Sequence, residues 1–577
     1  MQKYGELLRT LLEKRGIATE TEAEIFLNPS YKRDLHDPFL MRDMEKACVC
    51  LYEAIENKEK IVIYADYDCD GIPGAVILND LFKEINYQNY EVYIPQRNSE
   101  GYGLNFEAIK GFAKSGVKLL ITIDLGITAV TEVAQAEVDG IDVIIIDHHI
   151  PPEVLPRAYA ILNPKTDDYP EKMLCGAGVV FKFAQAFLKK YGEYFKVKDG
   201  AEKWMLDMAG LATLSDMVPL TGENRAIAYF GMKVLRKSPR PGLQKLLAKM
   251  KIEQKYISAD DIGFMVTPRL NAASRMDNPM RAFELLSTLD EREGGMLADH
   301  LSKINDERKT IVTSIMREVN KTLEKLENRE DTKVIVIGNP KWRVGILGLV
   351  ASKICDEHKK PVFVWGKDEN DCIKGSCRSD GSVSVVELMR ETSESFLDFG
   401  GHELAGGFTV HNEKIHFLEG ALCLNFKKIT TLKNTPSASG TSPYVGGKLG
   451  ERDPSLRSGV NFVSKFTLAD VHMKNWREVE KLEPFGFGNP KPVFLFENIK
   501  IDNIKKFGKN GSGEHLEIIF SDANDRYKKA KAVSFFSNID SFKNTLSVGL
   551  PVNLLATFDL SRFRGREELR LRIEDII

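Results

Sequence analysis

The chain has 577 residues, of which 43% are hydrophobic and 28% are charged, values that fit a folded globular protein and exclude disordered, collagen-like or rod-shaped chains. At about 150 residues per domain, this length predicts about three to four domains. The 80 Lys and Arg residues against 83 Asp and Glu residues leave a net charge of −3. A nucleic-acid site would therefore need a local basic groove rather than a cationic body.

No stretch of the sequence approaches the length of apolar chain that crosses a bilayer, and the opening segment, MQKYGELLRTLLEKRG, is charged and amphipathic. We therefore expect neither a transmembrane span nor a signal peptide, and we expect a cytoplasmic location. The eight cysteines are dispersed without a CxxC pair, which argues against a disulfide scaffold and against a thiolate zinc site.

The first part of the chain alternates short β-branched runs with helical patterns, for example at 74–85 and 105–116. This alternation predicts an α/β domain with a parallel sheet, whose active residues lie at the carboxyl ends of the strands. Asp66, Asp124 and Asp147 follow three of the apolar runs. The predicted strands lie at 60–66, 89–95, 118–124 and 142–149.

The rest of the chain changes pattern several times. Residues 200–290 are mostly helical in character, and Leu and Ile recur at three- and four-residue steps over 297–326. That periodicity predicts one long amphipathic helix, either a connection between domains or an ordinary core helix. A second strand–helix–strand pattern occupies 332–366, residues 429–460 are rich in Ser, Thr, Gly and Pro, and short alternating runs after 461 are typical of a small β-barrel.

The densest chemical signal is ADYDCDG at 65–71, directly after a predicted buried strand. Asp66, Asp68 and Asp70 place three carboxylates at every second position. Mutual repulsion and desolvation oppose burying them together without a cation. A calcium loop of the EF-hand type shares this pattern, but the glutamate that it needs is Ile77 here. Taken alone, the segment leaves both a metal site and a metal-free turn open.

A second signal, IDHH, also follows a buried run and contains His148 and His149. One of two adjacent histidines can ligate a metal while its neighbour contacts substrate, although a single histidine is more often structural. Asp124 ends the run KLLITID, and Asp216 lies in LATLSDMVPL. Each of these aspartates alone could be a helix cap or a turn residue. They indicate a site only in combination with the DxDxDG and IDHH motifs.

In this order, strand–DxDxDG, strand–DxG, strand–DHH and a later SDMVPL resemble the DHH phosphoesterases, and within them the RecJ family of exonucleases. Nine ordered motifs match that family and together cover nearly the whole chain. They are IPQRNSEGYGL (94–104), LCGAGVVFK (174–182), DMVPLTGENR (216–225), TPRLNAASRM (267–276), GILGLVASK (345–353), KGSCRS (374–379), FGGHELAGG (399–407), EPFGFGNPKPVF (483–494) and RFRGREELRLRIEDI (562–576).

The resemblance implies a fold of α/β class: a parallel-sheet DHH domain, joined by a long helix to a smaller α/β domain of the DHHA1 type, and a C-terminal oligonucleotide-binding-type β-barrel. In the barrel, arginines alternate with apolar residues from Arg562 on, but neighbouring carboxylates cancel the positive charge of these arginines. Phe485 and Phe487 could stack on bases or be core residues. The expected segments are a catalytic domain with a helical part, a connecting helix, a substrate-binding domain, a flexible insertion and the barrel, at 1–290, 291–330, 331–428, 429–460 and 461–577.

The resemblance also implies a centre of two Mn²⁺ or Mg²⁺ ions, with Asp124 as a bridging ligand. Ligation rich in oxygen with some imidazole suits these ions better than zinc. Asp70 is expected to act in catalysis or to orient its loop. His149 is expected to contact the scissile phosphate or the leaving oxygen, or else to hydrogen-bond a carboxylate. The implied metal ligands are Asp66, Asp68, Asp124, His148 and Asp216.

Phosphate contacts are implied as well, because guanidinium groups bind phosphate bidentately. Arg97, Arg378 and Ser379 would form a pocket for the 5′-phosphate end. Two positions depart from the family: Leu125 stands where Asn or Cys is usual, and Cys377 replaces a glycine in GSCRS. The implied nucleic-acid contacts are Arg97, Arg269, Arg275, Arg378, Ser379, Gly400, Gly401 and His402.

The function favoured by the resemblance is an exonuclease that degrades single-stranded DNA from the 5′ end to mononucleotides, in repair and recombination. Implied partners are single-stranded DNA, a single-stranded-DNA-binding protein and a helicase, and we expect a monomer. One alternative is a phosphodiesterase for short oligonucleotides or cyclic dinucleotides, which usually lacks the barrel and the long helix. Another is a catalytically inactive DNA-binding adaptor, which would have lost the acidic ligands.

Overall fold

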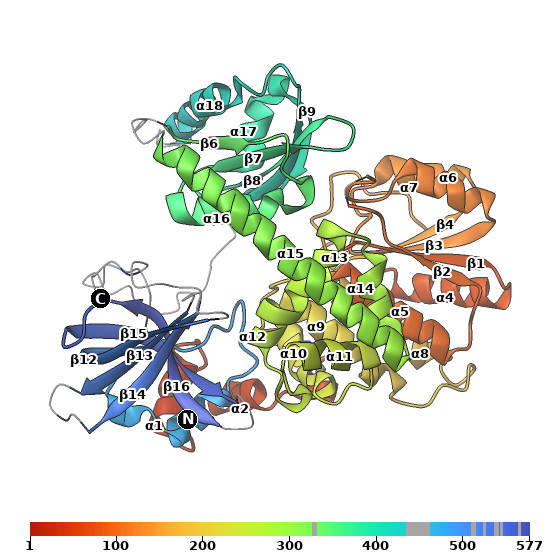
Figure 1. Cartoon of the computed structure of the whole chain (residues 1–577). Helices are drawn as coiled ribbons and strands as arrows, with labels where there is room; N and C mark the ends of the chain where they lie inside the picture. Colours follow the sequence, from red (N-terminus) through yellow and green to blue (C-terminus); the bar gives the residue numbers. More distant parts are fainter. Residues whose placement is uncertain are drawn as a thin grey trace. The chain divides into compact units, whose positions relative to one another are not determined.

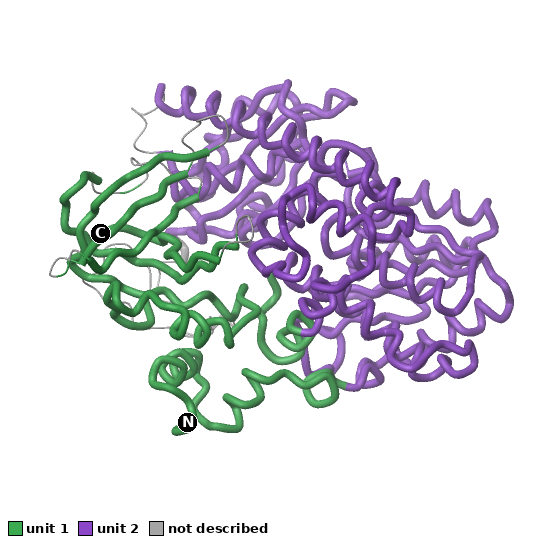
Figure 2. Tube along the Cα trace, turned by 60° about the horizontal axis from the view of Figure 1, so that its bottom comes forward, with its two compact units in different colours: residues 1–36, 217–229, 442–577 green, residues 37–216, 230–441 purple. Residues whose placement is uncertain are grey.

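The computed structural model describes the chain apart from the ranges given below, and the chain divides into two compact units, coloured separately in Figure 2. The larger unit comprises residues 37–216 and 230–441, and the other comprises residues 1–36, 217–229 and 442–577. The residues outside the description are 98, 326–331, 434–461, 509–514, 523–524, 526, 536–541, 543–545 and 563–566.

A five-stranded parallel sheet forms the first domain of the larger unit, in the order β2-β1-β3-β4-β5 (Figure 1). β1, β3 and β4 are buried along almost their whole length, because helices cover both faces of the sheet. Strands buried on both faces read as continuous apolar runs, so the predicted parallel sheet is confirmed. The strands are β1 (Lys60–Ala65), β2 (Tyr90–Tyr93), β3 (Val117–Ile123), β4 (Asp142–Ile146) and β5 (Ala160–Leu162).

Two layers of helices enclose this sheet. One face is covered by α6 (Phe106–Lys114) and α7 (Val130–Val138). The other is covered by α4 (Met44–Glu56), α5 (Gly71–Glu84) and α8 (Gly176–Tyr191) (Figure 1). The strand order reverses at β1, because β2 and β3 lie on opposite sides of it. Ligands of open α/β sheets bind beyond the carboxyl ends of the strands at such a reversal.

A layer of helices follows, and the long helix α15 packs on it. α15 (Glu291–Glu324) has 34 residues, and its first part contacts α11, α13 and α14. Val312, Ile315 and Val319 join the core of the next domain, so the helix both connects two domains and contributes to their cores. No helix of the described ranges, α15 included, has the length and apolar composition needed to span a bilayer. The preceding helices are α9 (Leu206–Ser215), α10 (Gly222–Leu235), α11 (Pro241–Lys249), α12 (Ala259–Asp261), α13 (Thr267–Met276) and α14 (Met280–Ser287).

The second α/β domain is built on a mixed sheet in the order β6-β7-β8-β10-β9, in which only β6 and β7 are parallel. α18 extends to Lys433, so the first residues of the predicted insertion at 429–460 are helical and the rest lie outside the described residues. The elements are β6 (Ile335–Gly338), α16 (Leu347–His358), β7 (Val362–Lys367), β8 (Ile373–Arg378), α17 (Val385–Glu391), β9 (Phe396–Gly401), β10 (Ala405–Val410) and α18 (Leu418–Lys433).

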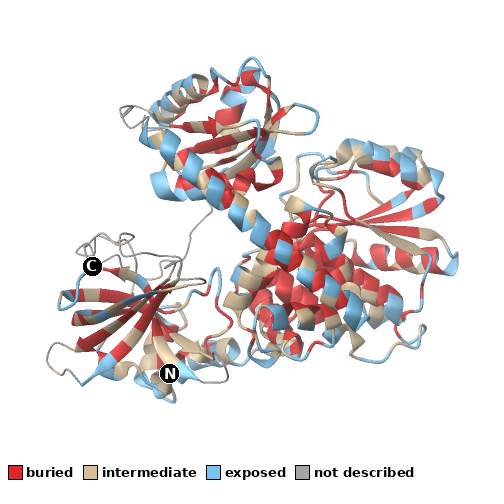
Figure 3. Cartoon of the chain, in the orientation of Figure 1, coloured by how far each residue is buried: buried red, intermediate tan, exposed pale blue. Residues whose placement is uncertain are grey.

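The smaller unit contains the predicted barrel. Its six strands run in the order β11-β12-β13-β14-β16-β15, and an additional pairing between β12 and β15 closes the sheet on itself. Figure 3 shows buried residues along these strands, which enclose one apolar core. The strands are β11 (Ser464–Phe466), β12 (Phe494–Phe507), β13 (His515–Asp522), β14 (Lys529–Phe535), β15 (Pro551–Ser561) and β16 (Glu568–Ile576), with α19 (Met473–Glu480) between the first two.

The start of the chain, residues 1–36, belongs to the same compact unit as the barrel. Helix α1 (Glu6–Glu13) buries Leu8, Leu11 and Leu12 in the same core as the barrel strands. Its periodic leucines show that one face is buried, but periodicity does not identify the surface on which that face packs.

We predict that Leu12→Ala destabilises the barrel unit by about 2–5 kcal/mol, because it opens a cavity at a side chain that is 0% exposed. The measurement is denaturant unfolding followed by tryptophan fluorescence, with Ile25→Ala as the matched control. Ile25 lies on the neighbouring helix α2 (Glu20–Leu27) and is 41% exposed, so its truncation should have little effect. Equal effects of the two changes would mean that α1 does not stabilise this unit.

Candidate metal centre

The three aspartates of ADYDCDG occupy the turn between β1 and α5. Asp68 holds this turn in shape, since its Oδ1 accepts hydrogen bonds from the N–H groups of Asp70 (2.8 Å) and Gly71 (3.2 Å). A Cβ at Gly71 would lie 2.4 Å from the carbonyl oxygen of Asp66, so only glycine allows the chain to fold back this closely. The turn therefore presents all three carboxylates at the carboxyl end of β1.

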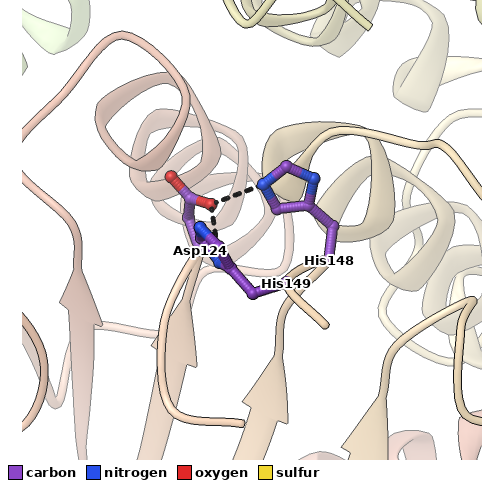
Figure 4. A group of neighbouring side chains, drawn as sticks. All are labelled: Asp124, His148 and His149. Atoms are coloured by element: carbon purple, nitrogen blue, oxygen red, sulfur yellow. Dashed lines mark ion pairs between the residues drawn. The ribbon is translucent and has the colours of Figure 1, made fainter. Parts of the chain in front are cut away.

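β3 and β4 end beside this turn and add further ligand atoms. Asp124 follows β3 with a left-handed φ of 60°, a conformation that aspartate tolerates better than most residues. His148 Nε2 lies 3.1 Å from Asp124 Oδ1, and His148 Nδ1 lies 3.9 Å from Asp216 Oδ2. Figure 4 shows Asp124, His148 and His149 converging from the two strand ends. Asp216 caps the carboxyl end of α9.

The potential ligand atoms form three overlapping sets, in each of which the atoms lie within 4.8 Å of one another. Asp124 and His148 each belong to two sets, which is the arrangement expected of two ions that share a carboxylate. All five predicted ligands are thus brought together from positions up to 150 residues apart in the sequence. The sets are Asp66–Asp68–Asp124, Asp70–His148–Asp216 and Asp124–His148–His149.

The electrostatics of this cluster fit a pair of divalent cations. Burial raises the pKa of Asp66 and Asp124 well above the usual range, and repulsion from neighbouring aspartates adds to it. Burial likewise raises the pKa of Asp216 to about 9. Within the described residues, Oδ1 of Asp66 and Oδ1 of Asp124 are buried without a hydrogen-bond partner. Burial lowers the pKa of His148 to about 3, which leaves a neutral imidazole able to ligate. Carboxylates with one imidazole suit Mn²⁺ or Mg²⁺.

Asp70 has a positioning contact in addition to its place in the cluster. Its Oδ2 and Oδ1 accept the N–H groups of Gly176 (2.6 Å) and Ala177 (2.8 Å) at the start of α8. A Cβ at Gly176 would lie 2.8 Å from the Cβ of Asp124, so glycine is required where the helix meets the ligands. Asp70 therefore fixes the N-terminus of α8 against the metal-binding turn.

His149 is oriented by Asp147, which the sequence analysis placed at a strand end without assigning it a role. His149 Nδ1 lies 2.7 Å from Asp147 Oδ1, and this carboxylate also accepts the N–H groups of His148 and Ile127. Burial opposes a charge on His149, but the hydrogen bond and the charge of Asp147 outweigh it and raise its pKa. The aspartate of IDHH, directly before the two histidines, is the signal that could have identified this orienting residue.

Arg97 lies within electrostatic range of two other predicted phosphate-binding arginines, Arg275 and Arg378. The Arg97 guanidinium lies 4.9 Å from the centre of the Tyr67 ring. Burial, followed by repulsion from Arg97, lowers the pKa of Arg275 to about 9. Burial also lowers the pKa of Arg378, whose Nε donates to Ser352 Oγ at 3.1 Å. Desolvated guanidinium groups that repel one another favour an anion among them.

Of the remaining predicted contacts, Arg269 and Ser379 are hydrogen-bonded within their own segments. Arg269 donates to a backbone carbonyl one turn earlier in the chain, and the hydroxyl of Ser379 closes its own turn. Gly401 has a φ of 139° in the tight connection of β9 and β10, whereas a Cβ at Gly400 would meet nothing within 4 Å. The ring of His402 is parallel to that of His149, with 6.3 Å between their centres.

Both departures from the family pattern face apolar cores. Leu125 is 1% exposed and packs in the core between the sheet and α6, while its carbonyl accepts the Thr122 hydroxyl. Cys377 is 0% exposed, and its sulfur lies 4.0 Å from that of Met389 in the core of the second domain. Neither side chain therefore replaces a metal ligand or fills the space beside Arg378.

Three family profiles match the chain: the DHH family N-terminal domain over residues 60–213, the DHHA1 domain over 331–422 and the RecJ OB domain over 464–575. The fold and the aspartate–histidine cluster thus define a DHH-family protein with a DHHA1 domain and a C-terminal OB domain.

Sequence relatives identify the family within this class of proteins. The single-stranded-DNA-specific exonuclease RecJ of Bacillus subtilis is 32% identical over 572 residues, which cover 99% of this chain and 67% of that protein. The protein of the same name from Escherichia coli is 32% identical over 430 residues, which cover 72% of this chain and 73% of that protein. The chain belongs to the RecJ family.

Solved structures agree with this assignment. Crystalline RecJ of Thermus thermophilus in complex with Mn²⁺ matches 100% of this chain and 76% of its own with a TM-score of 0.77, and at 23% identity this likeness supports the fold. An exonuclease RecJ bound to manganese matches 68% of this chain and 97% of its own with a TM-score of 0.60 at 28% identity.

Without metal, the protein should lose stability as the pH rises from 6 to 9. The folded-state pKa of Asp70 is raised to about 7 and that of Asp216 to about 9. Both lie above the unfolded value of about 3.9, so the folded state holds protons that the unfolded state has released, and the free energy of unfolding decreases with pH. Thermal unfolding in EDTA measures this trend.

Two controls accompany this measurement. Saturating Mn²⁺ should flatten the dependence, because the cation compensates the ionised carboxylates, and Asp216→Asn should reduce its slope in EDTA. A melting temperature that is constant or rises between pH 6 and pH 9 in EDTA would contradict the electrostatic account of the cluster.

Proposed function

We propose that the protein is a metal-dependent exonuclease that hydrolyses single-stranded DNA from its 5′ end and releases mononucleotides. The observation that carries the proposal is the buried cluster of carboxylates in which the Oδ1 atoms of Asp66 and Asp124 lack a hydrogen-bond partner among the described residues. Mutually repelling arginines lie within electrostatic range of this cluster, since the charge of Arg97 acts on Asp66 and that of Arg275 is acted on by Asp68. Relatives named as single-stranded-DNA-specific exonucleases support it.

The residues of the site have three proposed roles: metal binding, contact with the phosphate and positioning of α8. Asp66, Asp68, Asp124, His148 and Asp216 would hold two divalent ions, which when bound activate a water and neutralise the phosphoryl oxygens. Asp147 accepts the hydrogen bond of His149 Nδ1, so the Nε2 atom of His149 is the one that can meet the scissile phosphate or the leaving oxygen. Asp70 keeps α8 against the ligands.

End recognition is assigned to Arg97 and Arg378. Both are within electrostatic range of each other and come from different domains of the larger unit. A terminal phosphate carries more charge than an internal phosphodiester, so it gains more from two guanidinium groups. This difference supports attack at a phosphorylated 5′ end. The hydroxyl of Ser379 donates its hydrogen bond to the carbonyl of Val383 in its own turn, so this group is not assigned to the phosphate.

The barrel is proposed to extend the contact with the strand. Two of its arginines are balanced by carboxylates, since Arg562 lies 3.0 Å from Glu567 and Arg570 lies 2.6 Å from Asp559. Phe487 is 54% exposed and available for stacking on a base. Action as a monomer in the cytoplasm, with a helicase and a single-stranded-DNA-binding protein as partners, stays a prediction.

The first test replaces Asp124, which belongs to two of the three sets of potential ligands. Asp124→Asn should lower the rate of hydrolysis of end-labelled single strands by about 10³-fold or more, because metal coordination lowers the activation barrier by several kcal/mol. Strand binding, measured in EDTA by fluorescence anisotropy, should stay within a few fold of the wild type. Asp142→Asn is the matched control, since Asp142 is the exposed first residue of β4. A variant at Asp124 with near-normal turnover would exclude the two-metal assignment.

The second test concerns polarity and strandedness. A duplex with a single-stranded 5′ tail should be degraded much faster than a blunt duplex or one with a 3′ tail, because opening each terminal step costs about 1–2 kcal/mol of stacking. No GxxxxGK[ST] motif occurs in the sequence to drive that opening. Initial rates are compared at one salt concentration, since phosphate contacts depend on salt. Equal rates on the three substrates would contradict the requirement for a single-stranded tail, and fastest attack on the 3′-tailed duplex would contradict the proposed polarity.

A further inference from the structure

We propose that Lys165 is an additional substrate-binding residue of this site, whose ammonium group binds a non-bridging oxygen of the phosphodiester that is cleaved. The proposal rests on the proposed function. It adds to the proposed metal ions a positively charged side chain of the protein itself. Lys165 lies in the turn after β5, the last strand of the parallel sheet, and its side chain is half-buried beside the histidines that follow β4.

A buried asparagine fastens this turn to the DHH segment. Asn163 is 0% exposed, its Oδ1 accepts the backbone N–H of Lys165 at 2.9 Å, and its Nδ2 donates to the carbonyl oxygen of His149 at 2.9 Å. The hydroxyl of Thr166 closes the turn on the Asn163 carbonyl at 2.8 Å. The backbone of Lys165 is therefore held at a fixed place relative to His149, as a residue that must meet a substrate requires.

The side chain of Lys165 points to the same place. Its Nζ donates a hydrogen bond to the carbonyl oxygen of His148. An ammonium group has three N–H donors, and no ion pair joins Nζ to a carboxylate among the described residues. Two donors thus remain for a ligand beside His148 and His149.

The charge of Lys165 acts on the metal-binding cluster without being neutralised by it. Burial lowers the pKa of Lys165, whereas Asp147, Asp216 and Asp124 act in the opposite direction. The ammonium in turn opposes the effect of burial that raises the pKa of Asp216. The ammonium of Lys165 therefore interacts electrostatically with the proposed ligands, but among the described residues no carboxylate forms an ion pair with it.

Counting charges indicates what the ammonium binds. The four carboxylates among the proposed ligands would balance two divalent ions and Asp147 is paired with His149, whereas the charge of Asp70 is stabilised by two backbone N–H groups at the start of α8 and not cancelled by them. A cation beside two divalent ions is unfavourable unless an anion lies between them. The anion that the reaction brings to this place is the phosphodiester, and an ammonium donor to its oxygen stabilises the charge of the transition state.

A purely structural role is the competing explanation, because Lys165 also supports the His148 carbonyl. The experiment compares Lys165→Gln and Lys165→Arg with the matched control Lys172→Gln. Lys172 lies in the same connection and its Nζ also donates to a backbone carbonyl, that of Asp167, but its side chain is exposed. Each full-length protein is assayed for Mn²⁺ binding by calorimetry and for single-turnover cleavage of a single strand.

We expect Lys165→Gln to lower the single-turnover rate by about 10²-fold, the size of loss that follows removal of one donor to a transition-state oxygen. Lys165→Arg should recover most of the rate, and Lys172→Gln should behave as the wild type. Mn²⁺ stoichiometry and affinity should be unchanged in all three variants. Substituting sulfur for one non-bridging oxygen of the scissile phosphate should slow the wild type, and Lys165→Gln should add little to that loss for one of the two isomers.

Several outcomes would overturn this assignment. Weaker Mn²⁺ binding or a lower melting temperature in Lys165→Gln, with the same rate loss in Lys165→Arg, would mean that the residue only supports the DHH turn. An unchanged rate, or losses that add fully for both sulfur isomers, would mean that the ammonium does not touch the phosphate. A wild-type protein that cleaves no single strand would overturn the proposed function and this inference together, whereas the other outcomes affect Lys165 alone.

Discussion

Repulsion among buried carboxylates is the constraint on which the rest of the larger unit depends. Asp66, Asp70 and Asp124 are each at most 5% exposed, and every one of them has a raised pKa. A fold can keep such groups together only if its backbone is rigid enough to resist their separation when no cation is bound. The central strands β1 and β3 supply that rigidity, because their ends are fixed by hydrogen bonds on both sides within the sheet.

Most of the metal centre could be predicted because parallel strands bring their carboxyl ends to one edge. Asp66 and Asp124 follow the adjacent strands β1 and β3, and His148 follows β4, so sequence order and the rule for α/β sheets already place them together. The same reasoning does not reach Asp216, which lies at the end of a helix rather than a strand. Its place among the ligands came from the family resemblance, and the distance of 3.9 Å to His148 agrees with it.

What the sequence could not provide was the identity of packing partners. The leucines of α1 predict a buried face, but nothing in their spacing indicates that this face packs on the barrel strands more than 450 residues later. Asn163 and Lys165 are missed for a related reason. Turn residues after a strand usually interact with their own turn, and only the three-dimensional structure shows that these two reach the carbonyl groups of the DHH segment.

The segment that follows Asp216 packs against the motif EPFGFGNPKPVF at 483–494. The family resemblance alone assigns no role to this motif. The backbone N–H of Leu220 donates to the carbonyl oxygen of Phe487 at 2.8 Å, and a Cβ at Gly486 would lie 2.8 Å from the Leu220 side chain. Gly488 has a φ of 75° and lies against Pro219. Packing on the segment that follows Asp216 therefore explains the glycines at 486 and 488. Residues 217–229, which follow Asp216 in the chain, belong to the same compact unit as this segment.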